Sequence, residues 1–463
     1  MRYVSTRGEA PELGFEDVLL TGLARDGGLY VPASWPELPA RGIIELQGKP
    51  YEDVAHAVIR PFIGGAIPEA DLRKMIAAAY ASFGHPAVAP LKQLDDNQWL
   101  LELFHGPTLA FKDVAMQLLA RLMDWALARR RTSATIVGAT SGDTGGAAIE
   151  AFRSSSHATV FMMHPHGRVS EVQRRQMTTV DSPSIHNIAI EGNFDDCQAI
   201  VKALFNDLAF RDRVGLAGVN SINWARIMAQ TVYYVTAALS LGAPGRAVSF
   251  SVPTGNFGDV FAGLVAKRMG IPVERLVIAT NVNDILDRTL KTGRYETRGV
   301  TPSSSPSMDI QVSSNFERLL FEVHGRDPYA VRRMMASLAQ SGAFEIGSRE
   351  LDQIRHEFGS GAADEAETAS TIRETLAATG ELLDPHTAVG HAVACKAEAS
   401  AAPMITLATA HPAKFPDAVE KACGIRPALP KRLSHLMEAK ERFTVLPNDA
   451  GKVRDFILSQ QKA

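Results

Sequence analysis

The chain has 463 residues, and its 48 basic and 51 acidic side chains give a formal net charge of −3. This length accommodates two to four domains with a large core. A hydrophobic content of 46% and a charged content of 21% are ordinary for a soluble globular protein. No run of Lys and Arg indicates a nucleic-acid partner, since the densest, 129–131, is predicted to end a helix. We find no apolar run of membrane-spanning length and no secretion signal, so we expect a cytoplasmic protein.

The three cysteines, Cys197, Cys395 and Cys423, are far apart in the sequence and odd in number. This favours a reducing compartment over a disulfide framework. There is no CxxC pair, and the 13 histidines show no HExxH spacing, so we predict no metal site.

The first 95 residues are predicted to form a separate, mainly helical unit. Residues 51–64 and 69–83 carry apolar side chains at helical spacing. Residues 5–32 mix loop, helix and turn signals.

After residue 96, short β-branched runs alternate with helical stretches. The predicted strands are 134–140, 159–165, 184–190, 247–253, 275–281 and 404–410. The predicted helices between them include 194–210, 223–242 and 259–270. Apolar strands separated by helices are typical of a largely parallel sheet covered on both faces, so we predict an α/β fold.

Two segments interrupt this pattern. Residues 301–316 are rich in Ser and Pro and are predicted to form a loop. Residues 359–370 are small and acidic, and we expect a mobile, solvated loop there. The last thirty residues are predicted to close the fold with a strand and a helix.

Lys112 is the first candidate for chemistry, in the run HGPTLAFKDVAMQLLARLMDW. It lies beside Phe111 at the start of a segment that we predict to be an amphipathic helix. Partial burial of a lysine lowers its pKa and makes the amine a usable nucleophile and base.

A buried strand runs into the turn Pro253-Thr254-Gly255-Asn256-Phe257-Gly258-Asp259, and a helix follows at once. Converging backbone N–H groups and the positive end of the helix suit a phosphate. The turn is neither GxGxxG nor GxxxxGK[ST], which excludes the dinucleotide and Walker motifs. A tight strand–helix turn that needs glycine only for its geometry is the alternative.

A second glycine-rich turn, Thr140-Ser141-Gly142-Asp143-Thr144-Gly145-Gly146, follows the strand 134–140. The hydroxyls of Ser141 and Thr144 beside exposed N–H groups suit a substrate carboxylate. Asp143 could instead simply cap the next helix. A reactive lysine together with two anion-binding turns favours pyridoxal phosphate as the cofactor.

Thr409, His411 and Lys414 follow the last predicted strand, where open α/β sheets bind ligands. A neutral hydroxyl such as that of Thr409 suits a ring nitrogen, whereas His411 is interpreted as a loop histidine. In DPHTAVG, Asp384 and Pro385 predict a helix start.

The motifs HGPTLAFKD, TSGDTG, SVPTGNFGD, ATNVND, DPHTAVG and ATAHPAKF occur in this order. In this the chain resembles the threonine synthases of the longer bacterial and fungal type, within the tryptophan-synthase-β (type II) group of pyridoxal-phosphate enzymes. The resemblance runs from YVSTRGEAP to HPAKF. It implies a type II fold with two open parallel-sheet α/β domains and a helical N-terminal subdomain. The subdomain would be 1–95 and the catalytic region 96–463, divided into a small domain of about 105–185 and a large domain of about 186–463.

The resemblance also implies roles for single residues. Lys112 would hold the cofactor covalently, and Thr409 would face its pyridine nitrogen. Ser141 and Thr144 would contact the substrate, and Asp143 the cofactor ring, although many relatives carry Asn there and a carboxylate would repel the phenolic oxygen. The residues implied to hold the cofactor phosphate are Gly255, Asn256, Phe257, Gly258 and Asp259.

The implied reaction converts O-phospho-L-homoserine and water to L-threonine and phosphate. Lys414, Arg168 and residues 303–315 are candidates for holding the substrate phosphate. One alternative is a phosphate lyase that releases a 2-oxo acid and ammonia on the same scaffold. Another is a binding protein without turnover, which would not need the amine of Lys112. A monomer and a homodimer both fit this scaffold.

Overall fold

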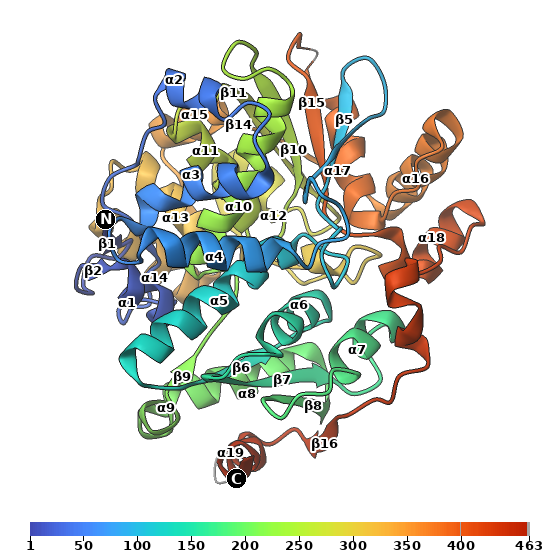
Figure 1. The fold of residues 1–463 in the computed structure, drawn as a ribbon. Helices are drawn as coiled ribbons and strands as arrows, with labels where there is room; N and C mark the ends of the chain where they lie inside the picture. Colours follow the sequence, from blue (N-terminus) through green and yellow to red (C-terminus); the bar gives the residue numbers. More distant parts are fainter. Residues whose placement is uncertain (399, 461–463) are drawn as a thin grey trace.

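The computed structural model describes residues 1–398 and 400–460 (Figure 1). The N-terminal unit joins a small antiparallel sheet, of order β2-β1-β3, to four helices. Its elements are β1 (Arg2–Ser5), β2 (Leu13–Gly14), α1 (Phe15–Thr21), β3 (Tyr30–Pro32), α2 (Ala40–Glu45), α3 (Tyr51–Ile63) and α4 (Glu69–Tyr80). Helices α3 and α4 confirm the two predicted by apolar spacing.

The larger sheet has the order β14-β11-β10-β15-β5-β4 and is parallel except at the edge pair β4–β5. Its strands are β4 (Leu91–Gln93), β5 (Gln98–Glu102), β10 (Val248–Pro253), β11 (Val273–Thr280), β14 (Phe358–Ala362) and β15 (Met404–Ala408). The predicted strands β10, β11 and β15 are confirmed, whereas β5 was not predicted because its apolar run is so short.

The smaller sheet is parallel throughout, with the order β16-β8-β7-β6-β9. Its strands are β6 (Ala134–Ala139), β7 (Ala158–Pro165), β8 (Ile185–Glu191), β9 (Leu216–Ala217) and β16 (Thr444–Pro447). The chain end thus supplies the predicted strand, and α19 (Ala450–Gln460) the predicted helix.

The predicted boundary near residue 185 does not match this strand pairing. β8, β9 and β16 all lie beyond it, yet they pair in the smaller sheet. Hydrogen-bond partners far apart in the chain decide sheet membership, and the apolar pattern of a strand does not reveal its partner.

Helices cover both sheets, as the apolar strands predicted (Figure 1). They are α5 (Lys112–Arg130), α6 (Asp143–Phe152), α7 (Glu171–Thr178), α8 (Phe194–Asn206), α9 (Leu208–Val214), α10 (Trp224–Ser240), α11 (Gly258–Arg268), α12 (Ile285–Thr292), α13 (Phe316–Val323), α14 (Pro328–Ser341), α15 (Ser348–Glu357), α16 (Glu365–Thr379), α17 (Pro385–Lys396) and α18 (Pro416–Cys423). A small hairpin pairs β12 (Arg294–Glu296) with β13 (Ala343–Glu345). Short 3-10 helices cover Pro306–Met308, Pro412–Lys414 and Lys431–Met437. The predicted helix 194–210 is divided at Asp207, whose side chain caps α9.

Helix α5 is not amphipathic, contrary to the prediction. Its residues 112–120 are all buried, so it has no solvent face over its first turns. The reason is its position, because α4, α6 and α10 all pack against it. Figure 1 shows α5 between α4 and the strands of the smaller sheet. Such a site buries whatever lies at the start of the helix.

The prediction of a mobile loop at 359–370 is wrong. Residues 358–362 form the edge strand β14, which pairs in parallel with β11, and α16 begins at Glu365 with Asp364 as its cap. The small residues serve close packing, since a Cβ on Gly361 would lie 2.8 Å from Val393. The segment 301–316 does form the predicted loop, apart from its 3-10 turn.

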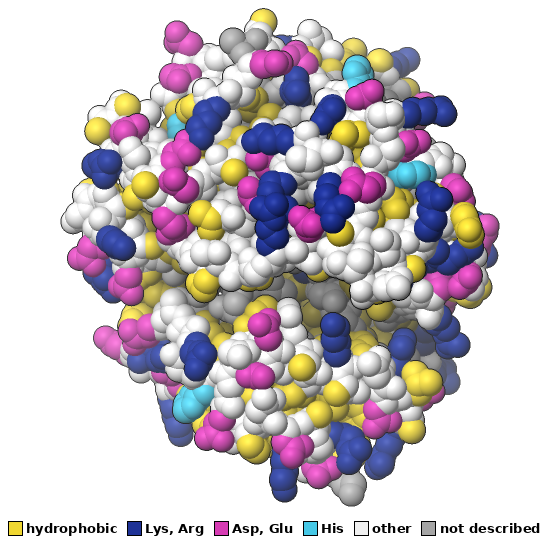
Figure 2. Space-filling model, turned by 180° about the vertical axis from the view of Figure 1, so that it is seen from behind, with side chains coloured by type: hydrophobic (Ala, Val, Ile, Leu, Met, Phe, Trp, Pro, Cys, Tyr) yellow, Lys and Arg dark blue, Asp and Glu magenta, His cyan; other side chains and the backbone are white. Residues whose placement is uncertain are grey.

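Figure 2 shows one face of the molecule, on which basic and acidic side chains are interspersed. A hollow crosses this face between its upper and lower parts. Over residues 1–398 and 400–460, no helix is both long and apolar enough to cross a membrane.

Candidate active site

Lys112 begins α5, and a tight turn positions it. The carboxylate of Asp113 accepts hydrogen bonds from the backbone N–H of Thr108 at 2.8 Å and from its hydroxyl at 2.7 Å. The N–H of Phe111 donates to the carbonyl of Thr409, just beyond β15, at 2.8 Å. The lysine is therefore pinned to the carboxyl end of the larger sheet, where the sequence predicted ligand binding.

The amine of Lys112 is buried, with 8% of the residue exposed. Its Nζ donates to Ser307 Oγ at 3.0 Å and more weakly to Asp143 Oδ2 at 3.4 Å. Burial lowers the pKa of Lys112; Asp143 opposes this shift, while the charges of Lys414 and Arg226 add to it. The predicted burial and its effect on the amine are thus both found.

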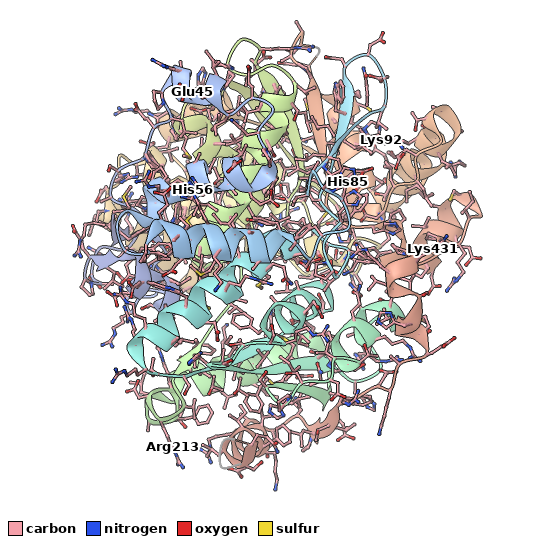
Figure 3. All side chains as sticks on the ribbon, in the orientation of Figure 1. Glu45, His56, His85, Lys92, Arg213 and Lys431 are labelled. Atoms are coloured by element: carbon pink, nitrogen blue, oxygen red, sulfur yellow. The ribbon has the colours of Figure 1, made fainter. Side chains whose placement is uncertain are left out.

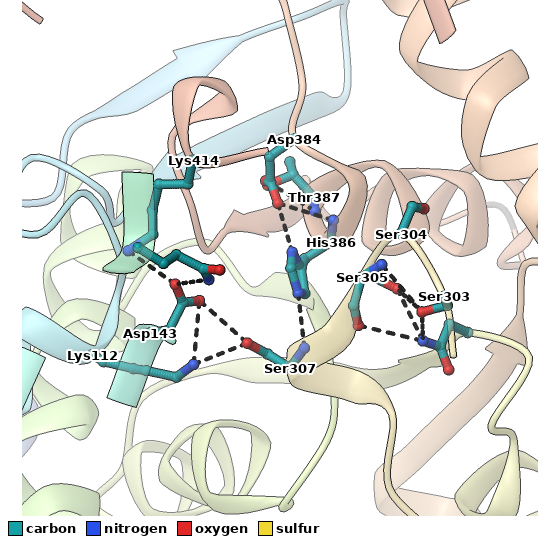
Figure 4. Close-up of polar contacts among 12 residues, drawn as sticks. Lys112, Asp143, Ser303, Ser304, Ser305, Ser307, Asp384, His386, Thr387 and Lys414 are labelled. Atoms are coloured by element: carbon teal, nitrogen blue, oxygen red, sulfur yellow. Dashed lines mark hydrogen bonds and ion pairs between the residues drawn. The ribbon is translucent and has the colours of Figure 1, made fainter. Parts of the chain in front are cut away.

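Asp143 begins α6 and faces two lysines (Figure 4). Its Oδ1 lies 2.9 Å from Lys414 Nζ and accepts a hydrogen bond from Gln173 Nε2 at 2.9 Å. Burial alone would raise the pKa of Asp143, but Lys414 and Lys112 overcome it and hold the pKa well below its ordinary value. The ammonium of Lys414 thus offsets the carboxylate charge that the sequence analysis found difficult to place beside a phenolic oxygen.

Lys414 is fully buried at the end of its 3-10 helix, beyond β15. Besides Asp143, its ammonium donates to the carbonyl of Thr108 at 2.7 Å and to Gln176 Oε1 at 3.1 Å. An ammonium has three N–H donors, and these three acceptors occupy them. Lys414 therefore has no free donor for a substrate phosphate, which argues against that candidate role. Arg168, the other basic candidate, is exposed in the turn after β7.

His386 and Asp384 hold Ser307 beside Lys112 (Figure 4). The backbone N–H of Ser307 donates to His386 Nε2 at 3.2 Å, so the ring proton is on Nδ1, which lies 2.8 Å from Asp384 Oδ1. The sequence analysis interpreted Asp384 only as a helix cap, which it also is. An Asp and a His two residues apart were the one available signal for this pair.

The predicted phosphate turn joins β10 to α11. Phe257 has φ 62°, a left-handed conformation unusual for a bulky residue, and a Cβ on Gly255 would lie 2.6 Å from the carbonyl oxygen of Ser307. The first N–H groups of α11 have no acceptor within the helix and are available to an anion. The 301–316 loop packs on this turn, since Ser313 Oγ donates to the carbonyl of Gly255 and Asn315 Nδ2 to that of Asn256.

The side chain of Asp259 contacts α10 and is not available to a phosphate. Its carboxylate accepts hydrogen bonds from the hydroxyls of Tyr233 and Tyr234 on α10, the second at 3.0 Å. Burial raises the pKa of Asp259 to about 7. Of the five residues predicted to hold a phosphate, Asp259 therefore offers its backbone N–H, while its carboxyl anchors α11 to α10.

Ser141 lies in the turn between β6 and α6, and Thr144 lies in the first turn of α6; both are half-buried and flank Asp143 in the sequence. The hydroxyl of Thr140 accepts hydrogen bonds from the N–H groups of Gly142 and Gly145, both at 2.9 Å. Thr140 shapes this turn, a role that the sequence analysis did not assign. Thr409 lies with 5% exposed at the end of the larger sheet.

The fold and this buried lysine between two glycine-rich turns are those of one class of enzymes. Residues 85–404 match the family model described as pyridoxal-phosphate dependent enzyme, which confirms the predicted type II α/β fold and its cofactor class. Residues 2–80 match the threonine synthase N terminus, and residues 387–457 match the threonine synthase C-terminal model.

Individual proteins agree with these models. The chain is 57% identical to a threonine synthase of Pseudomonas aeruginosa over 459 residues, covering 99% of this chain and 98% of the relative. It matches the crystal structure of a threonine synthase with bound pyridoxal phosphate from Brucella melitensis with a TM-score of 0.98, 62% identity and full coverage of both chains. The Escherichia coli threonine synthase matches with a TM-score of 0.85, 32% identity and full coverage of both. The chain belongs to the threonine synthase family.

Proposed function

We propose that the protein converts O-phospho-L-homoserine and water to L-threonine and phosphate, as a carbon–oxygen lyase with pyridoxal phosphate. The observation that carries this proposal is the amine of Lys112, which is buried, weakly paired and placed between two turns suited to anions. Membership of the threonine synthase family supports the choice of substrate.

The residues present fit the cofactor. The turn Gly255–Asp259 would hold its phosphate through backbone N–H groups, because two of its residues are glycines and the carboxylate of Asp259 is engaged by Tyr233. Lys112 would hold it covalently, and Thr409 would lie at its ring nitrogen. Asp143 would lie near its phenolic oxygen, where Lys414 supplies the charge that offsets a second anion.

When bound, the cofactor would stabilise the electron pair left on Cα after proton removal. Lys112 is the base proposed to take the Cα proton, because its pKa is lowered and its amine is near neutral groups as well as Asp143. The same amine would carry protons to and from Cβ. Phosphate leaves from Cγ and water adds at Cβ.

Ser141 and Thr144 would bind the substrate carboxylate at the start of α6. For the substrate phosphate, Arg168 and the 303–315 segment stay as candidates. Within that segment, the hydroxyl of Ser303 already donates to Asp309 Oδ1 at 2.6 Å. Ser305 Oγ accepts a hydrogen bond from Asn281 Nδ2 at 2.9 Å and lies 3.3 Å from Ser303 Oγ, so Ser305 is the better placed of the two to donate to a phosphate.

The proposal is tested by incubating the purified protein with O-phospho-L-homoserine and pyridoxal phosphate and analysing the amino acids formed. Threonine and phosphate in equal amounts are expected. Phosphate with 2-oxobutyrate would assign the lyase reaction instead, and no turnover would refute both. Lys112→Ala should abolish turnover and the visible absorbance that borohydride shifts, whereas the exposed Lys431→Ala should retain both. Figure 3 places Lys431 at the edge of the molecule, on the C-terminal segment.

We also propose a cytoplasmic location, and either a monomer or a homodimer. The division into 1–95 and 96–463 stays a prediction. The strand pairing supports one change to it, with β8, β9 and β16 assigned to the smaller domain.

A further inference from the structure

Two buried lysines share the carboxylate of Asp143, and they are held very differently. Lys414 has three short contacts, to Asp143 Oδ1 at 2.9 Å, to the carbonyl of Thr108 at 2.7 Å and to Gln176 Oε1 at 3.1 Å. Lys112 has one good hydrogen bond, to Ser307 Oγ at 3.0 Å, and a long contact of 3.4 Å to Asp143 Oδ2. One ammonium is therefore locked in place, and the other is loosely held.

Gln176 and Thr108 hold the ammonium of Lys414 in place without the help of Asp143. Gln176 Nε2 also donates to the carbonyl of Thr108 at 3.0 Å, so the two acceptors of Lys414 are fixed to each other. Lys414 has no exposed surface and belongs to a short 3-10 helix. Its charge cannot move away when the site changes.

We propose that Lys414 is a positioning residue, which holds one oxygen of Asp143 so that Lys112 is left with only the other, at longer distance, and stays free to react. The inference rests on the proposed function, in which Lys112 is the reacting amine. In this inference the fixed charge of Lys414 influences the protonation of Lys112, and Lys414 does not contact the substrate phosphate.

The charged groups around Lys112 act on its pKa in opposite directions. From α6, Asp143 stabilises its ammonium; from the other elements, Lys414 and Arg226 on α10 oppose it. His386 on α17 reaches this cluster through Ser307, whose backbone N–H donates to His386 Nε2. Removing Lys414 would take away a like charge, and it would also remove the cation that competes with Lys112 for the carboxylate of Asp143, which then keeps only the neutral donors Gln173 and Ser307 besides Lys112. Both effects favour the ammonium of Lys112 and make its amine less available.

The test is competitive acetylation of the full-length, cofactor-free protein over a range of pH, with labelling of Lys112 quantified by peptide mass spectrometry. Acetic anhydride reacts with unprotonated amines, so the midpoint of labelling reports the titration of Lys112. In Lys414→Met we expect the midpoint of Lys112 labelling to rise by about one pH unit. At any pH below the midpoint, labelling of Lys112 should then be about tenfold lower than in wild type. Lys414→Gln keeps a hydrogen-bond donor without the charge, is less disruptive to the fold, and should shift the midpoint in the same direction.

Two controls make the result specific. Asp143→Asn removes the attraction and should move the Lys112 midpoint to lower pH, opposite to the Lys414 variants. Lys431→Met changes an exposed lysine and should leave the midpoint unchanged. A midpoint that is unchanged or lower in a folded Lys414 variant would overturn the inference. Because labelling needs neither cofactor nor turnover, this outcome is distinct from failure of the proposed reaction.

Discussion

A methyl group at Gly255 would collide with the loop that carries Ser307. An ideally placed Cβ would lie 2.6 Å from the carbonyl oxygen of Ser307, whereas ordinary contact begins at 3.4 Å. In G255A the two backbones must therefore separate by about 0.8 Å. Neither partner is a flexible side chain end, so the phosphate turn or the 301–316 loop has to shift.

Overpacking of this kind costs about 1–3 kcal/mol. Where the cost falls on the cofactor-bound form, it corresponds to roughly 5–150-fold weaker binding of pyridoxal phosphate. We expect this loss because the turn supplies the N–H groups that would hold the cofactor phosphate, and a shift of 0.8 Å is large for a hydrogen bond. A shift of Ser307 would in addition loosen its contact with Lys112.

Fluorescence titration of the cofactor-free protein with pyridoxal phosphate measures the affinity, and thermal unfolding of the same protein measures the stability. Gly299→Ala is the matched control, since nothing lies within 4 Å of its added methyl group and the residue is exposed. If G255A matched wild type in both affinity and melting temperature, the tight contact would have no energetic weight and the reasoning would be refuted.

Three further changes test other parts of the site. The pKa of Asp259 in the folded protein, about 7, lies above its ordinary 3.8, so this carboxyl lowers the stability progressively as pH rises from about 4 to 7. The stability of D259N relative to wild type should therefore increase over that range, by up to about 4 kcal/mol. Urea unfolding at several pH values measures this difference. A constant difference between the two proteins would contradict this. D384N removes the carboxylate that accepts the hydrogen bond from His386 Nδ1, so we expect the free energy of unfolding to fall by about 1–3 kcal/mol. The melting temperature should fall with it, and an unchanged melting temperature would contradict this expectation. F257A loses a buried ring packed 5.3 Å and 5.7 Å from two other phenylalanine rings, so its free energy of unfolding in urea should fall by about 3–5 kcal/mol; an unchanged value would contradict this.

The sequence predicted those parts of the fold that local pattern decides. All six predicted strands exist, because uninterrupted β-branched runs between helices have few other stable structures. The mistakes have tertiary causes. Residues 359–362 looked solvated because they lack large side chains, yet β11 supplies hydrogen-bond partners and Val393 packs against Gly361. Helix α5 looked amphipathic, yet neighbours cover its polar side.

The candidate site divides in the same way. Lys112 and the two glycine-rich turns were evident, since their residue types and spacing carry the chemistry. Ser307 and Lys414 reach the site from 195 and more than 300 positions along the chain, and no local pattern shows where a loop will fold back. Lys414 was a candidate for the substrate phosphate, and its contact with Asp143 was not predicted, because a single lysine in a sequence does not reveal a buried carboxylate.

The two sheets contribute different kinds of electrostatics, and this separation can be tested. The larger sheet carries the turn that we propose to bind an anion through backbone N–H groups, and the only carboxyl of that turn, Asp259, is engaged with α10. The smaller sheet supplies Asp143, around which two ammonium groups gather. Changes in the first should therefore alter cofactor affinity, and changes at Lys414 should alter the titration of Lys112. The two parts meet at Ser307, which touches both Lys112 and the backbone over Gly255. G255A should accordingly disturb both quantities, whereas Lys414→Gln should change the titration of Lys112 in the cofactor-free protein.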